Sequence, residues 1–310
     1  MRQIILKTLV VTLGIITSAT ADSHISRLKE LDVEVVAPSS GVDPSLLKKL
    51  GKKCELPNGS SEAQVFENQP NKFKLLDKAL KSNKKILWAF RGGYGVDKLM
   101  PQVYSSDYSR TKKKIIIGYS DITPLLVHFS QKYNWIAISA PMLKDFALGN
   151  KSKTSYAAIL NFLNGKMKSF RMSDLKPLNH KAGTSENISG RTTGGNLTCL
   201  VSTIGTPWQV KTAGRILFLE DTAVVGYRLD RLLMHMQNAG LFRDVAAIIF
   251  GDFGADVAKV LRTFAAQVNV PVFKSSSFGH ENNNLPFGYE FNATIHHSNK
   301  GNFQVEMRTW

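Results

Sequence analysis

Short apolar runs alternate along this chain with segments whose apolar residues recur every three or four positions. The apolar runs predict buried strands at Val33–Ala37, Lys85–Phe90, Ile115–Ile117 and Ile136–Ala140. The helical period predicts helices at Pro44–Leu50, Phe73–Lys81, Ile122–Phe129 and Ala157–Leu163. Because strands and helices follow one another in turn, the first half of the chain is predicted to be a doubly wound α/β domain with a parallel sheet.

The pattern changes after residue 165. Residues 166–189 are polar and basic, with few large apolar side chains in their second half, which predicts a linker. Organised elements return as a strand at Arg215–Leu219, a helix at Tyr227–Ala239 and a strand at Val245–Phe250. We therefore expect an N-terminal domain over 22–165, a linker over 166–189 and a C-terminal domain over 190–310.

Residues 1–21 have the composition of a secretory signal peptide. They carry Arg2 and Lys7, a short apolar stretch over Thr8–Ile16, and the small-residue site Ala19-Thr20-Ala21. A membrane-spanning helix needs roughly 20 apolar residues, and no later segment approaches that length. We expect cleavage of this segment and export to the periplasm without stable membrane insertion; an uncleaved N-terminal anchor is the alternative.

The formal net charge of +16 falls by two, to +14, when the two basic residues of the signal segment are removed. A cationic exported protein suits an anionic cell envelope. The lysines are scattered and no basic motif is interleaved with aromatic residues, so nucleic-acid binding is not expected. Cys54 and Cys199 could form one disulfide or stay two solitary thiols, and neither has the neighbouring cysteine of a zinc site, so no metal is expected.

Ser120 lies at a tight turn between the apolar run and the amphipathic helix of Lys114–Phe129. A serine there can cap the helix N-terminus, or it can present its hydroxyl as a nucleophile at a strand-to-helix turn. Position alone favours the cap. Parallel sheets bind ligands beyond the carboxyl ends of their strands, and Gly92 and Gly93 share that edge in a turn that matches no nucleotide-binding fingerprint. The shared edge strengthens the catalytic hypothesis.

A nucleophilic serine needs a base, and the base needs an orienting group. Glu220 follows the predicted strand at Arg215–Leu219 and so reaches a strand's carboxyl end, although a solvated turn acid fits that position equally well. His280 lies in FGHENNNLPFG, a loop of turn-forming residues, and functional groups concentrate on such loops. The helical His128 and His235 fit structural roles. Ser120, Glu220 and His280 are therefore the candidate catalytic residues.

Five blocks, read in order along the chain, resemble the LD-carboxypeptidase family of serine peptidases, which also contains the microcin C self-immunity hydrolases. The blocks are RGGYGVDKLM, GYSDITPLLVHF, GGNLTCLVSTIGTPW, LFLEDTAVVGYRLDRLL and FGHENNNLPFG. The resemblance covers most of Val33–Ile295 and implies a flavodoxin-like or amidotransferase-like N-terminal domain, a smaller α+β C-terminal domain and a homodimer. It also implies Ser120 as nucleophile, Glu220 as orienting carboxylate and His280 as general base and acid.

The resemblance further implies an oxyanion hole formed by the backbone N–H groups of Gly93 and Asp121. A weaker hypothesis assigns Arg91 to a substrate carboxylate, and neither a metal nor a cofactor is implied. Two departures from the family blocks, Lys98 in place of the usual arginine and Pro124 in the first helical turn, leave the triad untouched. The signal peptide is a larger departure, since family members are commonly cytosolic recycling enzymes.

The resulting expectation is a metal-independent serine carboxypeptidase that releases the terminal D-alanine from murein tetrapeptides. The bond cut would join the L-configured centre of a diacid residue to D-Ala. Two alternatives stay open: hydrolysis of a microcin C-like peptide-nucleotide by the same residues, and non-catalytic binding of murein. An intact triad argues against binding alone, whereas the positive charge suits either.

Overall fold

The computed structural model describes residues 23–52, 69–254, 257–297 and 302–309. The segment expected to be a signal peptide, residues 1–21, lies outside the described residues, and so does Cys54. None of the helices in the described ranges is long and apolar enough to cross a membrane.

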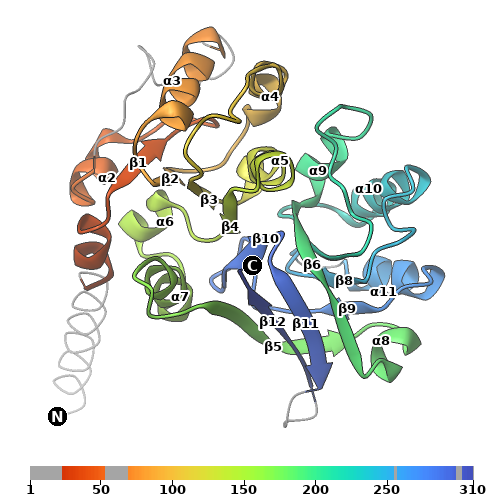
Figure 1. Ribbon diagram of the computed structural model, residues 1–310. Helices are drawn as coiled ribbons and strands as arrows, with labels where there is room; N and C mark the ends of the chain where they lie inside the picture. The colour runs from red at the N-terminus through yellow and green to blue at the C-terminus, as the bar shows by residue number, and fades with distance from the viewer. Residues whose placement is uncertain (1–22, 53–68, 255–256, 298–301, 310) are drawn as a thin grey trace, which may run out of the picture.

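A five-stranded sheet forms the N-terminal part of the molecule, in the order β1-β2-β3-β4-β10 (Figure 1). Its strands are β1 (Val33–Val36), β2 (Ile86–Ala89), β3 (Ile115–Gly118), β4 (Ile136–Ser139) and β10 (Phe287–Tyr289). The first four are parallel, and β10 runs antiparallel to β4. All the residues of β2 are buried, as is typical of a parallel strand covered on both faces.

Helices cover both faces of this sheet. They are α2 (Pro44–Lys49), α3 (Gln69–Lys81), α4 (Val96–Ser105), α5 (Thr123–Tyr133), α6 (Leu143–Leu148) and α7 (Lys153–Leu163), with the short 3-10 helix η2 (Ser120–Ile122) before α5. Figure 1 shows α3, α4 and α5 on one face and α2, α6 and α7 on the other. In α4, the buried Val96, Leu99, Met100 and Val103 recur at the helical period. The predicted doubly wound sheet is confirmed.

The C-terminal part is a closed barrel in the order β11-β12-β5-β9-β8-β7-β6. Its strands are β5 (Ser169–Pro177), β6 (Asn187–Asn196), β7 (Arg215–Glu220), β8 (Ala247–Phe250), β9 (Val272–Lys274), β11 (Asn292–His297) and β12 (Phe303–Arg308). Its helices are α8 (His180–Thr184), α9 (Leu197–Ser202), α10 (Gly226–Asn238) and α11 (Ala258–Gln267). Strands β6 to β9 pair in parallel and the remaining pairs are antiparallel, so this part is separate in architecture from the first.

The prediction that residues 166–189 form a linker is wrong. This segment contains β5 and α8, and β6 begins within it at Asn187. In β5 the buried Phe170 and Met172 alternate with the exposed Arg171 and Ser173, which is the period of a strand with one face on the core. Three large apolar residues, Phe170, Met172 and Leu175, give a weak sequence signal in a basic stretch, yet β5 closes the barrel by pairing with β12 and β9.

Strand β10 connects the two parts. It follows β9 of the barrel in the sequence, yet it pairs with β4 of the first sheet. Directly after it, the buried Glu290 accepts hydrogen bonds from the Arg215 guanidinium at 2.6 and 3.0 Å, which returns the chain to the barrel. The loop between β9 and β10 therefore passes from one part of the molecule to the other, and it carries His280.

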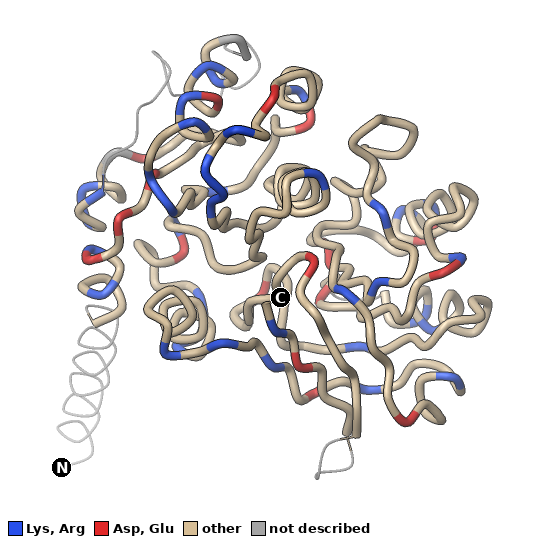
Figure 2. The backbone as a smooth tube through the Cα atoms, viewed as in Figure 1, with Lys and Arg blue, Asp and Glu red and all other residues tan. Residues whose placement is uncertain are grey.

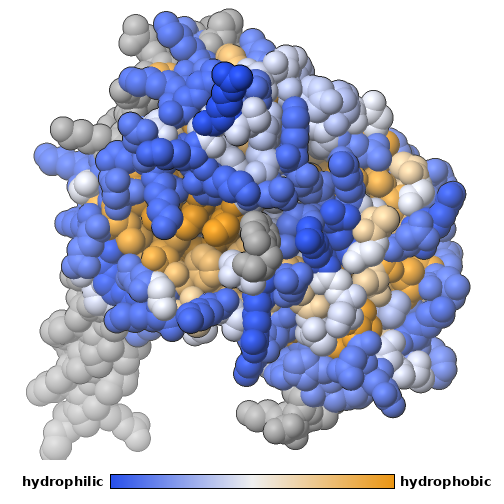
Figure 3. All heavy atoms as spheres, in the orientation of Figure 1, coloured by the Kyte–Doolittle hydropathy of each residue, from blue (hydrophilic) through white to orange (hydrophobic). Residues whose placement is uncertain are grey.

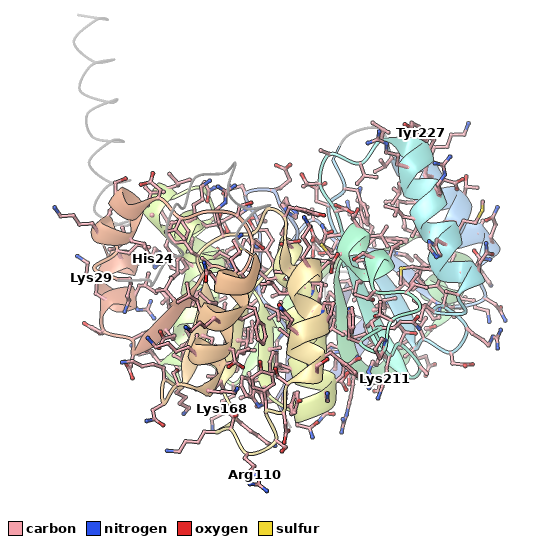
Figure 4. The ribbon with its side chains drawn as sticks, turned by 90° about the horizontal axis from the view of Figure 1, so that it is seen from above. His24, Lys29, Arg110, Lys168, Lys211 and Tyr227 are labelled. Atoms are coloured by element: carbon pink, nitrogen blue, oxygen red, sulfur yellow. The ribbon has the colours of Figure 1, made fainter. Side chains whose placement is uncertain are left out.

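The strands define two opposite edges of the molecule, which Figure 4 shows. Arg110 and Lys211 precede β3 and β7, whereas Tyr227 lies in α10, after β7. In this view the two basic residues lie at one edge and Tyr227 at the other. The carboxyl ends of β3 and β7 thus point toward the same edge.

The surface carries its positive charge in a dispersed form. Figure 2 shows Lys and Arg residues spread over both parts of the chain. The face in Figure 3 is mainly hydrophilic, with a hydrophobic area where α6 and α7 lie in Figure 1. The dispersed lysines agree with the scatter seen in the sequence.

Gly194 offers a test of the pairing between β6 and β7. Its φ angle is +134°, and a Cβ atom there would overlap the carbonyl oxygen of Phe218, its partner in β7. We predict that Gly194→Ala lowers the free energy of unfolding by about 2–5 kcal/mol, through backbone strain and overpacking. Urea denaturation followed by tryptophan fluorescence measures this.

The matched control is Gly183→Ala, at an exposed position in α8 where a Cβ meets no atom within 4 Å. Its free energy of unfolding should stay within about 1 kcal/mol of the wild type. Equal losses in the two variants would contradict the prediction.

Candidate active site

Ser120 adopts a strained turn directly after β3. Its φ angle is +59°, in the left-handed region that residues other than glycine rarely occupy. The N-cap residues of η2 and α5 are Tyr119 and Ile122, and neither cap has a side-chain hydrogen bond. The capping interpretation of Ser120 is therefore wrong, because a cap requires extended backbone whereas this turn is left-handed.

The glycine turn after β2 comes very near Ser120. A Cβ atom on Gly92 would lie only 3.1 Å from Ser120 Oγ. Gly93 has a φ angle of +126°, and a Cβ there would overlap Ser40 Oγ, which also accepts a hydrogen bond from the Tyr94 N–H at 3.3 Å. Only glycine permits this approach of the backbone. The turn is thus fixed against Ser120 and is not a plain flexible connection.

Asp121 is buried beneath these turns. Its Oδ2 accepts hydrogen bonds from the Val96 N–H at 3.1 Å and from the Ser39 hydroxyl. Burial raises the pKa of the Asp121 carboxyl group, and the hydrogen bond from Ser39 opposes the rise. The carboxyl group joins the turns that follow β1, β2 and β3. The predicted oxyanion-hole residues, Gly93 and Asp121, belong to two of these turns.

Glu220 and His280 form a direct pair. Glu220 ends β7, its side chain is 4% exposed, and its Oε2 lies 2.6 Å from His280 Nδ1. Burial is the largest single effect on the pKa of His280 and lowers it, but the hydrogen bond and the charge of Glu220 outweigh burial together. The pKa of His280 is therefore above its ordinary value. With Nδ1 engaged by the carboxylate, Nε2 is the ring nitrogen left for other chemistry.

Tyr119 brings His280 to the Ser120 turn. The two rings pack edge to face with their centroids 5.0 Å apart. Burial raises the pKa of the Tyr119 phenol above its ordinary value, so this neighbour stays uncharged. Because Tyr119 directly precedes Ser120 in the chain, this ring contact brings the His280 loop to the turn that carries the serine. A tyrosine in an apolar block carries no sequence signal for such a contact, and the sequence analysis missed it.

Asn196 connects the serine turn to the carboxylates of β7. Its Nδ2 donates to Asp221 Oδ1 at 2.9 Å and lies 3.5 Å from Glu220 Oε1. Its backbone N–H donates to Thr123 Oγ1 at 3.1 Å, and this hydroxyl donates to the Ser120 carbonyl oxygen at 2.7 Å. Asn196 is also the N-cap residue of α9, where its side chain accepts a hydrogen bond from the Cys199 N–H. Its place in the sequence carries no signal for the contacts with Thr123 and Asp221.

The structure thus brings Ser120, Glu220 and His280 to one edge, with Gly93 and Asp121 in the turns around Ser120. The catalytic roles of these residues stay predictions. Arg91, half-buried at the end of β2, opens the glycine turn, and its assignment to a substrate carboxylate also stays a prediction.

Metal and disulfide chemistry have few candidate residues. Within the ranges that the structure describes, no group of three or more His, Cys, Asp or Glu side chains is arranged to hold a metal ion. Among the described residues Cys199 has no disulfide partner, and burial raises the pKa of its thiol. Its pairing with Cys54 stays open because Cys54 lies outside those ranges.

Comparison with known proteins gives a consistent result. The model of the LD-carboxypeptidase N-terminal domain matches residues 33–140, and that of the LD-carboxypeptidase C-terminal domain matches residues 189–295. A Rickettsia conorii protein named as a carboxypeptidase is 39% identical over 285 residues, which are 86% of this chain and 89% of the relative. The murein tetrapeptide carboxypeptidase of Pseudomonas aeruginosa is 28% identical over 221 residues, 65% of this chain and 70% of that protein.

The fold is shared with a solved structure. The crystal structure of muramoyltetrapeptide carboxypeptidase from Oxalobacter formigenes superimposes with a TM-score of 0.75 at 22% identity, covering 89% of this chain and 99% of that one. The two matched domains, the similar relatives and the common fold agree with the five sequence blocks. This chain therefore belongs to the LD-carboxypeptidase family and is a serine-type carboxypeptidase.

Proposed function

We propose that this protein releases the terminal D-alanine from murein tetrapeptides, with Ser120 as nucleophile, His280 as general base and acid, and Glu220 as the group that orients His280. The observation that supports the proposal best is the 2.6 Å contact between Glu220 Oε2 and His280 Nδ1. The His280 ring also packs on Tyr119, the residue before Ser120, which occupies a left-handed turn. The Pseudomonas aeruginosa relative, named a murein tetrapeptide carboxypeptidase, supports the choice of substrate.

The reaction would proceed through an acyl-enzyme. Ser120 Oγ attacks the carbonyl carbon of the bond to D-Ala while His280 Nε2 takes the hydroxyl proton. The backbone N–H groups of Gly93 and Asp121 stabilise the negative charge on the carbonyl oxygen; losing one such donor typically costs about 10²–10³ in rate. His280 then gives its proton to the leaving amine. Water, deprotonated by His280, cleaves the ester and regenerates Ser120.

The strained turn has a role in this mechanism. A non-glycine residue in the left-handed region costs on the order of 1–3 kcal/mol. At the end of a strand this conformation exposes the serine hydroxyl above the sheet, as in other nucleophile turns. Arg91, at the start of the neighbouring glycine turn, is the residue we propose for the terminal carboxylate of the substrate.

We propose that the protein is exported to the periplasm and acts there. Residues 1–21 have the pattern of a signal peptide, and cell-wall peptides are substrates available outside the inner membrane. We predict that the protein recovered from a periplasmic fraction begins at Asp22, which intact-mass measurement checks. A chain that stays in the cytoplasm with its N-terminus intact would contradict export.

The proposed assembly is a homodimer. Sedimentation equilibrium tests it, and a measured mass equal to that of the monomer would reject it.

The first test of the activity is mass spectrometry of a murein tetrapeptide incubated with the mature protein. We predict loss of one alanine, unaffected by a metal chelator and reduced at least about 10⁴-fold by Ser120→Ala, because no other group supplies the attacking oxygen. Ser109→Ala, an exposed serine in a turn, is the matched control and should retain full activity.

Other outcomes separate the alternatives. Cleavage of a peptide-nucleotide but not of the tetrapeptide would replace the proposed substrate. Binding of murein without turnover by the folded wild type would reject the enzyme's proposed reaction.

The pH dependence tests the role of Glu220. His280 must be neutral to accept a proton, so kcat/KM should fall as pH drops through its pKa, which Glu220 holds above the ordinary histidine value. We predict that Glu220→Gln moves this acid limb to lower pH, because burial remains while the negative charge is lost, and lowers kcat by roughly 10²–10⁴. Glu281→Gln, an exposed carboxylate on the His280 loop, should keep kcat within about threefold. An unmoved acid limb in Glu220→Gln would contradict the assignment.

A further inference from the structure

A buried ammonium group lies behind the histidine loop. Lys151, in the connection between α6 and α7, is only 7% exposed. Its Nζ donates hydrogen bonds to two successive backbone carbonyl oxygens, that of His280 and, at 2.6 Å, that of Glu281. A lysine is rarely buried unless its charge has partners, and here the partners are the backbone of the loop that carries the proposed base.

The same short segment holds the loop at two further points. The Ser152 N–H donates to the Asn282 carbonyl oxygen at 2.8 Å, and the Asn284 N–H donates to Ser155 Oγ at 2.9 Å. Residues 151–155 thus contact the loop at four of its five positions from 280 to 284. The contacts attach His280, which the barrel supplies, to the part of the molecule that supplies Ser120.

Lys151 is itself held in place. Its backbone N–H donates to the Tyr156 hydroxyl at 2.9 Å, and that hydroxyl donates to the Asp145 carbonyl oxygen at 2.6 Å. Its Nζ lies 5.5 Å from the centre of the Tyr119 ring, and the same ring packs against His280. The ammonium group, the tyrosine ring and the imidazole therefore form one packed unit next to Ser120.

Burial and neighbouring charges shift the pKa values of Lys151 and His280 in opposite directions. Burial lowers the pKa of Lys151, whereas the carboxylates of Asp145, Glu281 and Glu220 favour its charged form. The positive charge of Lys151 in turn lowers the pKa of His280, against Glu220 and Asp221, which raise it. Tyr119 faces the imidazole as an uncharged group.

We infer that Lys151 is a positioning residue: its ammonium group fixes the His280 loop against the Ser120 turn and sets a positive charge behind the imidazole. The inference rests on the proposed function, since it concerns the same histidine. Without the ammonium group, two successive carbonyl oxygens of the loop lose their donor, and the backbone of His280 loses a contact that holds it in place. Small displacements of a catalytic group can cost about 10² in rate.

The experiment compares Lys151→Met, Lys151→Arg and the wild type on the murein tetrapeptide across pH. We expect Lys151→Met to lower kcat by roughly 10–100-fold with KM within about threefold. We also expect the acid limb of the kcat/KM profile of Lys151→Met to move to higher pH. Losing the positive charge of Lys151 raises the pKa of His280, because that charge disfavours the imidazolium form. Lys151→Arg keeps the charge and should restore most of kcat and leave the limb unmoved. Lys153→Met, an exposed neighbour, is the control for a lost lysine.

Each result decides the inference. Unchanged kcat and an unchanged acid limb in folded Lys151→Met would overturn it, and so would a loss of kcat with the limb unmoved in both Lys151 variants, which marks a structural role alone. If the wild type does not release alanine, the proposed function fails by itself. The pKa of His280, followed by NMR, must then still rise in Lys151→Met, and its failure to rise would overturn the inference independently.

Discussion

The hydrogen bond between Glu220 and His280 is the contact on which the rest of the site depends. A carboxylate with a 4% exposed side chain has lost nearly all its water, and such a group is costly to bury unless a partner compensates. The imidazole is that partner, at 2.6 Å. The pair forms only if the end of β7 and the loop between β9 and β10 stay together, so β7, β8 and β9 must pair before the site exists.

The second requirement is that Ser120, from a different sheet, meets this pair. Several short connections between the two parts satisfy this requirement. Asn196 and Thr123 link the end of β6 to the carbonyl group of Ser120, and Tyr119 packs on the imidazole. Strand β10, which lies in the sequence between the barrel strands β9 and β11, extends the first sheet by pairing with β4. These connections hold the proposed catalytic groups in place before substrate arrives, which is a condition for effective catalysis.

The turn around Ser120 contains two features that lower the stability of the fold. Ser120 occupies the left-handed region, and Asp121 is buried with a raised pKa. Both features persist because the surrounding turns determine them: Ser39 and Val96 donate to the Asp121 carboxyl group, and Gly92 admits the serine side chain. Strain of this kind is common where a side chain must be presented in one orientation. The buried Lys151 fits the same pattern, since its ammonium group is compensated by the loop carbonyl groups that it holds and by nearby carboxylates.

The sequence by itself determined the parallel sheet and the candidate residues, because both depend on local patterns. Runs such as Ile115–Ile117 indicate buried strands, and the turn-rich loop around His280 indicates a positioned functional group. The tertiary structure alone decided which distant residues meet. The basic segment at 169–177 forms the barrel strand β5, and β10 pairs with β4 of the first sheet. Lys151 donates a hydrogen bond to the carbonyl oxygen of His280, which lies far from it in the sequence. These are contacts between segments far apart in the chain, and periodicity along one segment carries no information about its partner in space.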